Sequence, residues 1–375
     1  MDKGSYLIAQ RLFAKKACKI TTFILYAQIF LQKNEKKLSF FAHFEKKHYF
    51  CSMNRRNLYG IVSLTGLLVV LAVLDVCCGS VFILPFGQKS LLEELVLTDI
   101  RLPKMLTAIL AGASLSVAGL MMQTLFRNPL AGPYILGVSS GAGLGVALVT
   151  MGAYTLALPP MASSLSIVLA AVIGSGLVMA LVMWVARYVK SNVSLLIVGM
   201  MFGAIAGALV NLVQNFSNPD SLKLFIVWTL GSLNNVGWSE LTILAIVLLL
   251  GWIVTILLLK PLNGLVLGEN YARSLGIQVE RTRLWIVLAT GLLAGSVTAF
   301  CGPIAFVGVA VPHIARGLVQ SGDHRWTMPM SALIGADLIL LCDILCNLFT
   351  HPLPISTLSA LFGAPIILSI ILKQR

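Results

Sequence analysis

Apolar residues along this 375-residue chain gather into long runs, and the polar residues between the runs are confined to short segments. Most of the runs approach or exceed the roughly 20 residues that an α-helix needs to span a bilayer core. The ten runs lie at about 58–84, 105–126, 131–151, 161–186, 193–213, 238–259, 284–301, 303–320, 328–349 and 354–372. Segments of about ten residues with alternating polarity, which mark a transmembrane β-barrel, are absent from the sequence. The pattern predicts an all-α polytopic membrane protein with ten transmembrane helices.

Two segments between the runs carry patterns of their own. Residues 222–233 are apolar but too short to span a bilayer, which favours a re-entrant or interfacial helix. Residues 260–283 mix charges with regularly placed apolar residues, which predicts two short helices across the membrane face. Those apolar residues are Leu265, Leu267, Ala272, Leu275 and Ile277. A plain solvated connector is the alternative, but a connector needs no apolar face, so we expect a docking surface for a soluble partner.

The composition agrees with a membrane protein, because 58% of the residues are hydrophobic and only 11% are charged. Basic residues also predict the orientation, since Lys and Arg are enriched in cytoplasmic loops. With the N-terminus inside, thirteen basic residues beyond residue 52 fall on the inner side: Arg55, Arg56, Arg127, Arg187, Lys190, Lys260, Arg273, Arg281, Arg283, Arg316, Arg325, Lys373 and Arg375. Four fall on the outer side: Lys89, Arg101, Lys104 and Lys223. Both termini are therefore expected in the cytoplasm.

Residues 1–52 differ from the rest of the chain. They hold ten Lys or Arg against three Asp or Glu, and so about half of the formal net charge of +13. Nucleic-acid binding is one interpretation, but basic residues beside a first membrane span are ordinary retention signals. A fresh start follows at Met53, where two arginines precede a long apolar run. We expect Met53 to be the initiator and 1–52 a mis-assigned extension; an amphipathic helix on the membrane surface is the alternative.

Spans 2–5 and 7–10 form two groups of four, offset by five positions. Because the offset is odd, the two groups would have opposite orientations in the membrane, which is an inverted repeat of the kind common in transporters.

Small residues, as in 111–119, predict close helix packing. Pro129, between the second and third runs, and Pro133, at the start of the third, disfavour a continuous helix and predict a chain reversal. Four glycines are then expected to let the third span pack closely: Gly137, Gly141, Gly143 and Gly145.

Motifs for nucleotide binding, catalysis or metal binding are absent from the sequence. It contains no G-x-x-x-x-G-K-[ST] phosphate loop and no CxxC pair among its seven cysteines, which favour packing roles. Three acidic residues lie within the runs without a basic partner in the same run: Asp75, Asp337 and Asp343. His313 and His351 could ligate haem, but a lone histidine is more often a hydrogen-bonded structural residue. We therefore expect no catalytic residue, metal site or cofactor in this chain.

Five stretches resemble the FecCD-type permeases, the membrane subunits of ABC importers for iron-siderophores, haem and cobalamin. They occur in the family's order and include "RLPKMLTAILAGASLSVAG" at 101–119, "LGENYARSLGIQVERTR" at 267–283 and "GPIAFVGVAVPHIARGLVQ" at 302–320. Together the stretches cover nearly everything from residue 53 onward. The resemblance implies that residues 53–375 form a permease domain with a ten-span, BtuC-like fold.

The resemblance also implies partners. Two permease subunits, here a homodimer, would work with two cytoplasmic ATP-binding cassette ATPases and a periplasmic or lipoprotein substrate-binding protein. ATP and Mg²⁺ would bind to the ATPase chains, which fits the missing phosphate loop. The loop 260–283 matches the family's coupling helices, and the expected ATPase contacts are Gly268, Glu269, Ala272, Leu275 and Gly276. The loop 190–196 matches the inner gate, with Asn192 and Val193 at the constriction.

On the outer face, Arg101 and Lys104 match the family's basic pair, which implies docking of the binding protein through complementary charges. Snorkelling at the membrane interface is the alternative. The chain departs from the family pattern four residues after Asp343, where Asn347 replaces an expected arginine, and the following outer loop is shortened. These departures bear on binding-protein recognition and on the substrate.

The sequence thus predicts a permease of the bacterial cytoplasmic membrane that imports an iron chelate, either a siderophore or haem, by alternating access. A cobalamin permease of the same family is the first alternative. An ion-driven secondary transporter and a membrane-embedded enzyme using Asp343 and His313 are alternatives from other classes. A nucleic-acid partner is not expected.

Overall fold

The computed structural model describes residues 55–79, 90–152, 164–189, 191–348 and 353–373. Every regular element in these ranges is a helix. Residues from Tyr59 onward form one compact unit, and its packing is described below. The predictions for residues 1–52 and Met53 fall outside the described residues, as do Lys89, Lys190 and His351.

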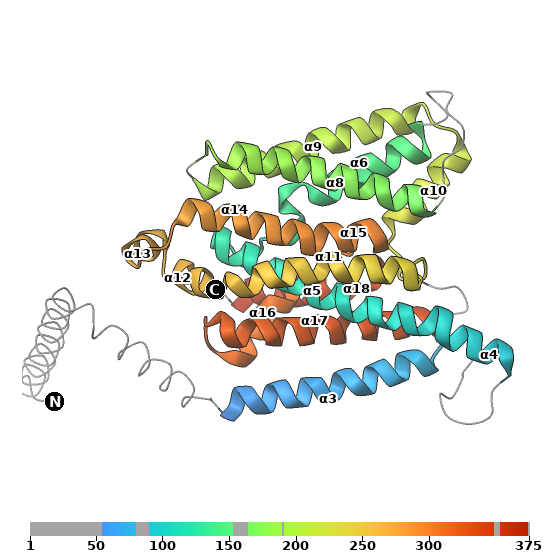
Figure 1. Cartoon of the computed structure of the whole chain (residues 1–375), viewed down its shortest axis with the longest axis horizontal. Helices are drawn as coiled ribbons and strands as arrows, with labels where there is room; N and C mark the ends of the chain where they lie inside the picture. Colours follow the sequence, from blue (N-terminus) through green and yellow to red (C-terminus); the bar gives the residue numbers. More distant parts are fainter. Residues whose placement is uncertain (1–54, 80–89, 153–163, 190, 349–352, 374–375) are drawn as a thin grey trace, which may run out of the picture. The chain divides into compact units, whose positions relative to one another are not determined.

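Seven helices of the described residues are long and apolar enough to cross a membrane, which confirms a multi-pass helical membrane protein. They are α3 (Arg55–Cys77), α4–η2–α5 (Leu91–Phe126), α8 (Ser164–Ala186), α9 (Asn192–Asn215), α11 (Trp238–Leu257), α14–η4–α15 (Val279–Cys301) and α17 (His324–Asn347). Shorter apolar helices occupy the remaining predicted runs: α6 (Val138–Thr150), α16 (Val307–Val319) and α18 (Ile355–Lys373). Most of these helices lie side by side along one direction (Figure 1). The count of ten spans stays a prediction.

The second run begins earlier than predicted. Instead of starting near residue 105, the helix starts as α4 (Leu91–Leu95), continues as the π-helix η2 (Val96–Arg101) and becomes α5 (Leu102–Phe126). Ser90 caps the start, because its hydroxyl accepts from the backbone of Glu93, whose carboxylate accepts from the Ser90 N–H at 2.8 Å. Arg101 and Lys104 therefore lie within a long helix, and the prediction of an outer loop at these residues is wrong.

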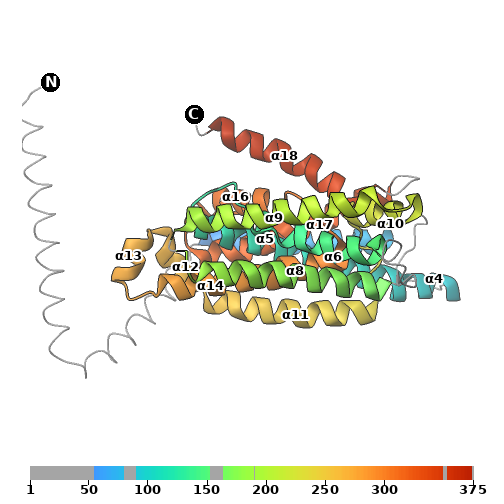
Figure 2. The same ribbon diagram turned by 90° about the horizontal axis from the view of Figure 1, so that it is seen from above.

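The helix α5 runs through the middle of the bundle, between helices on both sides (Figure 2), and most of its residues are buried. Its glycines meet glycines of two neighbouring helices. A Cβ atom on Gly112 would overlap the backbone of Gly335 in α17, and one on Gly119 would overlap the backbone of Gly308 in α16. Backbones can approach this closely only where both helices carry small residues. The predicted close packing around residues 111–119 is confirmed.

The chain reverses between α5 and α6, as the two prolines predict. Arg127 ends α5 in the left-handed conformation with φ of 50°, and η3 (Pro133–Leu136) is a short 3₁₀ helix. Gly137, with φ of 75°, then leads into α6. The left-handed conformation at Gly137 is one that glycine adopts without steric cost.

The glycines of α6 pack against α8, with one exception. A Cβ atom on Gly141 would come within 2.6 Å of the Gly174 carbonyl oxygen, and one on Gly145 would overlap the Ala170 carbonyl oxygen. A Cβ atom on Gly143 would meet other atoms no closer than 3.9 Å. The predicted close approach is therefore wrong for Gly143.

Three short helices connect the long ones. The first, α10 (Pro219–Thr229), is capped by Asn218, whose side-chain oxygen accepts from Ser221 N at 2.8 Å. It is the short helix predicted at 222–233, shifted toward the N-terminus. The other two, α12 (Leu259–Val266) and α13 (Glu269–Ser274), confirm the two short helices predicted within 260–283, and they lie together at one end of the bundle (Figure 1).

Candidate functional site

The helix α13 stands between two glycines with positive φ. Gly268 has φ of 114° and Gly276 has φ of 80°, values that other residues rarely adopt, so the chain can turn sharply on either side of α13. Ala272 is fully buried, whereas Leu275 is 58% exposed. Four of the predicted ATPase contacts therefore differ in exposure. Leu275 and Gly276 are exposed, whereas Gly268 and Ala272 are buried.

Two further exposed apolar side chains lie near Leu275: Leu267, which belongs to the apolar face predicted for 260–283, and Tyr271, which was not predicted. Leu267 is 63% exposed and Tyr271 is 50% exposed. Tyr271 precedes Leu275 by four residues, a spacing that places two residues on one face of a helix. That spacing was the available signal in the sequence. We call Leu267, Tyr271 and Leu275 the α13 patch.

Glu269, at the start of α13, is bonded to the first residue of α9. The Asn192 side-chain amide donates to Glu269 Oε1 at 2.5 Å and to the Leu125 carbonyl oxygen, at the end of α5, at 2.8 Å. Glu269 Oε1 also lies 3.9 Å from Nη2 of Arg283 in α14. Two long helices, α9 and α14, thus meet α13 through one carboxylate, and Asn192 also ties α9 to the end of α5. The carboxylate joins a predicted coupling residue to a predicted gate residue.

Arg283 extends this hydrogen-bond network to the chain segment that follows α8. Its side chain is almost fully buried, and its Nη1 donates to the carbonyl oxygen of Val189, just after α8, at 2.9 Å. A buried guanidinium requires hydrogen-bond acceptors and a nearby negative charge, because its desolvation is costly. Val189 and Glu269 supply them. Sequence reasoning counted Arg283 only as a loop charge, because its distant partners leave no local signal.

Val193 follows Asn192 directly but takes no part in the network. Its side chain is 67% exposed and begins a stripe of exposed apolar residues along α9. The stripe continues at a spacing of three or four residues: Ile197, Met201, Ile205, Leu209 and Leu212. The two predicted gate residues thus face different surroundings, since Asn192 is bonded to α13 and Val193 projects from the subunit.

A second polar cluster fixes the neighbouring α12. The side-chain oxygen of Asn263 in α12 lies 2.8 Å from Nδ1 of His324, and its amide donates to Asp323 Oδ1 at 2.7 Å. His324 Nε2 lies 2.9 Å from the hydroxyl oxygen of Thr124 in α5. His324 is 2% exposed. This histidine was missed because its partners are far away in the sequence, and it ties α12 to α5 and α17.

Lys104, predicted to dock a binding protein, makes bonds within the chain instead. Its ammonium lies 2.9 Å from Asp343 Oδ2 and donates to Asn347 Oδ1 at 3.0 Å. The Asn347 amide in turn donates to Asp343 Oδ2 at 3.2 Å. Asp343 thus has its basic partner on another helix, and Asn347 completes the bonding at the position where the resemblance implies an arginine.

Arg101, the other predicted docking residue, is also turned inward. It is 8% exposed, and its Nη1 donates to the carbonyl oxygens of Val76 at 2.8 Å and Cys77 at 2.9 Å. These carbonyls lie at the C-terminal end of α3, where helix backbone oxygens lack intrahelical partners. Arg101 therefore caps α3.

Charged side chains gather at one cavity of about 260 Å³ within the described residues, which is lined by Asp75, Arg101, Lys104 and Asp343. Among the described residues, no three or more His, Cys, Asp or Glu side chains lie together in an arrangement that could hold a metal ion. The five described cysteines are free thiols, and His313 has an interaction partner within the protein. Asp343 and His313, which the enzyme alternative combines, belong to different helices, and Asp343 is bonded to Lys104.

Comparisons with known proteins agree with this architecture. The hemin transport system permease protein HmuU of Yersinia pestis is 38% identical over 280 residues, which cover 74% of this chain and 83% of that relative. The vitamin B12 import system permease protein BtuC of Vibrio parahaemolyticus is 35% identical over 325 residues, covering 86% and 96%. An ABC transporter assigned to the metal-chelate type, solved in an inward-facing conformation, is 32% identical with a TM-score of 0.75; the match covers 84% of this chain and 98% of that one.

The family assignment follows from the extent of these matches. The model of the FecCD transport family matches residues 62–373, which include every helix described from α5 to α18 and the larger part of α3. The resemblance that the sequence motifs indicate is confirmed. This chain belongs to the FecCD transport family.

Proposed function

We propose that this chain is the membrane-spanning permease subunit of an ABC importer that moves an iron chelate, either a siderophore or haem, into the cytoplasm. The observation that carries the proposal is its similarity along most of its length to permeases named for hemin and vitamin B12 transport. A cobalamin substrate is the second candidate, and the vitamin B12 relatives favour it. Family members are transport permeases, so the chain itself performs no covalent chemistry.

ATP hydrolysis is assigned to a separate ATPase subunit, which would bind ATP and Mg²⁺. The sequence contains no phosphate loop, and the α13 patch offers exposed apolar side chains where the family places its coupling helices. Gly268, Glu269 and Ala272 would then act from inside: Gly268 shapes the turn, Ala272 anchors α13, and Glu269 links it to α9. Leu275 and Gly276 remain our candidates for direct ATPase contact.

Movement of α13 would reach the gate through Glu269 and Asn192. Because Asn192 is the first residue of α9, a shift of α13 pulls on the same helix that presents Val193. Alternating access requires that nucleotide-driven motion at the ATPase changes the position of pore-lining helices. The exposed stripe on α9 suits either a pathway wall or contact with a second copy of this chain.

The remaining architecture is proposed from the family. Two copies would form a homodimer in the bacterial cytoplasmic membrane, each with ten spans, an inverted repeat and both termini in the cytoplasm. Residues 53–375 would be the permease domain, preceded by the extension 1–52. A binding protein would dock at the end opposite α13. There Arg101 and Lys104 would hold the outer ends of α3, α5 and α17 in position for docking.

Transport in proteoliposomes with the partner ATPase tests the function directly. Uptake that depends on ATP and stops when the ATPase phosphate-loop lysine is replaced supports the importer. Uptake that persists in that variant would indicate a secondary transporter. Growth of a deletion strain on haem, siderophores or cobalamin as separate nutrient sources then identifies the substrate.

A further inference from the structure

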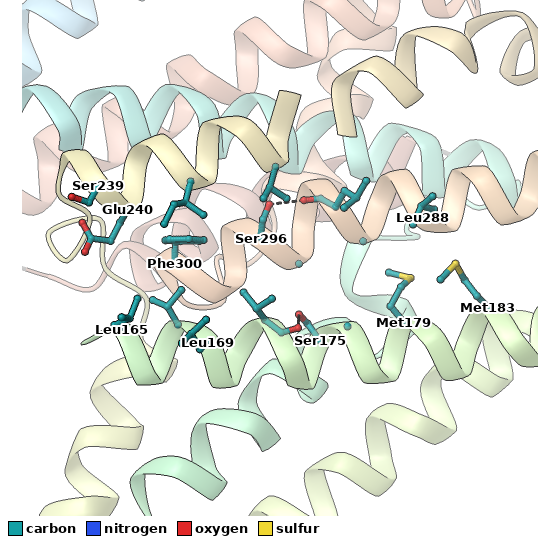
Figure 3. Close-up of a pocket in the computed structure, with 18 residues that line it drawn as sticks. Leu165, Leu169, Ser175, Met179, Met183, Ser239, Glu240, Leu288, Ser296 and Phe300 are labelled. Atoms are coloured by element: carbon teal, nitrogen blue, oxygen red, sulfur yellow. Dashed lines mark hydrogen bonds between the residues drawn. The ribbon is translucent and has the colours of Figure 1, made fainter. Parts of the chain in front are cut away.

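A groove lined almost entirely by apolar side chains runs between α8, α11 and the α14–η4–α15 helix (Figure 3). Its volume is about 610 Å³. Leu165, Leu169 and Met179 line it from α8, while Leu288 and Phe300 face them from the opposite helix (Figure 3). The groove therefore offers an elongated apolar space on the side of the bundle.

Glycines help to form this groove. Gly176 of α8 lines it, and a Cβ atom on Gly176 would find no neighbouring atom within 4 Å. Gly291 and Gly295 line it from η4 (Gly291–Gly295), a π-helical segment of a kind that frequently occurs at functional sites. At Gly176 the space follows from the missing side chain, whereas at Gly291 the end of the Met179 side chain packs where a Cβ atom would lie.

A second cavity of about 440 Å³ adjoins the groove near the end of the bundle that carries α13. Met183 and Leu288 line both cavities, so the two lie next to each other. Trp184 and Trp285 line the second cavity, and their side chains are 58% and 51% exposed. Indole rings prefer the headgroup level of a membrane, where an apolar ring and a polar N–H are both accommodated.

Arg187 and Arg281 also line the second cavity, and both side chains are exposed. Neither guanidinium group makes a hydrogen bond or ion pair with any of the described residues. The carboxylate of Glu280, adjacent to Arg281 in the sequence, is instead paired with Arg273 at 2.6 Å. Two guanidinium groups at the mouth of an apolar groove are suited to a phosphate, which arginine binds with paired N–H donors.

We propose that this groove binds one anionic phospholipid, with an acyl chain between α8 and α11 and the phosphate at Arg187 and Arg281. The stretch of α8 from Leu165 to Met183 is about 27 Å long at 1.5 Å per residue. One leaflet is roughly half of the ~30 Å hydrocarbon core, so an acyl chain fits within the groove. Basic pockets between transmembrane helices on the cytoplasmic side are known to select anionic headgroups.

The headgroup position lies beside the network that holds α13. Arg283, two residues after Arg281, donates to Val189, two residues after Arg187, at 2.9 Å. A phosphate bound by Arg187 and Arg281 therefore links α8 and α14 at the same junction. Lipid binding would stabilise that junction in addition to filling the groove.

Native mass spectrometry of the full chain in detergent tests the site, with phosphatidylglycerol and phosphatidylcholine of identical acyl chains as probes. We expect one phosphatidylglycerol to be retained, with a preference over phosphatidylcholine of roughly ten- to thirty-fold from two interfacial cations. The Arg187→Ala/Arg281→Ala variant should lose this preference while still binding either lipid weakly. Gly176→Leu should reduce retention of both lipids, because leucine has room to extend into the groove.

Matched controls separate this site from general lipid coating. Arg127→Ala/Lys260→Ala removes two exposed cations from the same end of the bundle, and Gly66→Leu adds a leucine at an exposed glycine with equally open surroundings on α3. Both should retain the preference of the wild-type chain. Equal retention of the two lipids by the wild-type chain overturns the proposal, as does an unchanged preference in the Arg187→Ala/Arg281→Ala variant. The outcome does not depend on whether the chain imports a chelate.

Discussion

Asn192 and Glu269 are 77 residues apart in the sequence, and their side chains are joined by a hydrogen bond of 2.5 Å. One begins α9 and the other begins α13. The resemblance to FecCD permeases implied separate roles for them, Asn192 at the gate and Glu269 at the ATPase. Their contact gives a direct physical route from α13 to α9.

Breaking this contact should separate ATP hydrolysis from transport. We expect Asn192→Ala to lower the uptake per ATP hydrolysed, because a hydrogen bond to a charged group contributes about 1.5–3 kcal/mol. Simultaneous measurement of uptake and phosphate release in proteoliposomes gives this ratio. Glu280→Gln, which removes an exposed ion pair with Arg273, is the control and should leave the ratio close to that of the wild type. An unchanged ratio in Asn192→Ala would show that the contact carries no coupling.

The α13 patch should be needed to hold the ATPase. Leu275→Asp places a charge on a side chain that is 58% exposed in the folded subunit, so the permease should still fold while ATPase co-purification falls. Gly276→Asp should act in the same way, with added strain because its φ is 80°. Leu92→Asp is the matched control, since Leu92 is 74% exposed on α4, at the other end of the bundle (Figure 1). Equal co-purification of the Leu275→Asp and Leu92→Asp variants would place the docking surface elsewhere.

The contact between α5 and α16 predicts a sharp difference between two glycines. Gly119→Ala would force α5 away from the backbone of Gly308, and overpacking of this kind costs about 1–3 kcal/mol. Gly66→Ala, where a Cβ atom meets nothing within 4 Å, should be neutral or slightly stabilising. Thermal unfolding of the two variants in the same detergent measures the difference. Equal melting temperatures would contradict the packing described for α5.

Local patterns in the sequence were enough to place most of the helices. Apolar runs located the membrane helices, and the regular apolar positions in 260–283 located α12 and α13. The second run was placed from residue 105 onward, after the charges of Arg101 and Lys104, whereas the helix begins at Leu91 and continues through η2 into α5. Hydropathy alone cannot show that charged residues beside an apolar run belong to the same helix.

The family motifs predicted single residues of the candidate site but not the contacts between them. Family motifs selected Asn192 and Glu269, but no motif indicates that the two side chains touch. Arg283 and His324 were missed, since each is a single polar residue whose partners lie on distant helices. The burial of the Arg101 and Lys104 side chains was missed for the same reason. A charged residue near a helix end is expected to be exposed unless the helix that supplies its partner is known.

The buried pair Lys104–Asp343 distinguishes a structural role from a docking role. The two side chains are 10% and 5% exposed, so removing only the lysine leaves a buried carboxylate without its cation, a change that costs about 3–5 kcal/mol. Lys104→Met should therefore lower the melting temperature strongly, and Lys104→Met/Asp343→Leu should recover most of the loss because neither charge remains. Arg273→Met, which breaks an exposed pair, should change the stability by at most about 1 kcal/mol and serves as the control.

The recovered double variant then allows docking to be measured without a folding defect. If Lys104 acts by holding α5 against α17, the double variant should bind the substrate-binding protein with nearly wild-type affinity, because its fold is intact. If Lys104 contacts the partner directly, affinity should fall although stability has recovered. Titration of the reconstituted permease with the binding protein, at low and high salt, separates the two cases, since a direct charge contact weakens as salt rises.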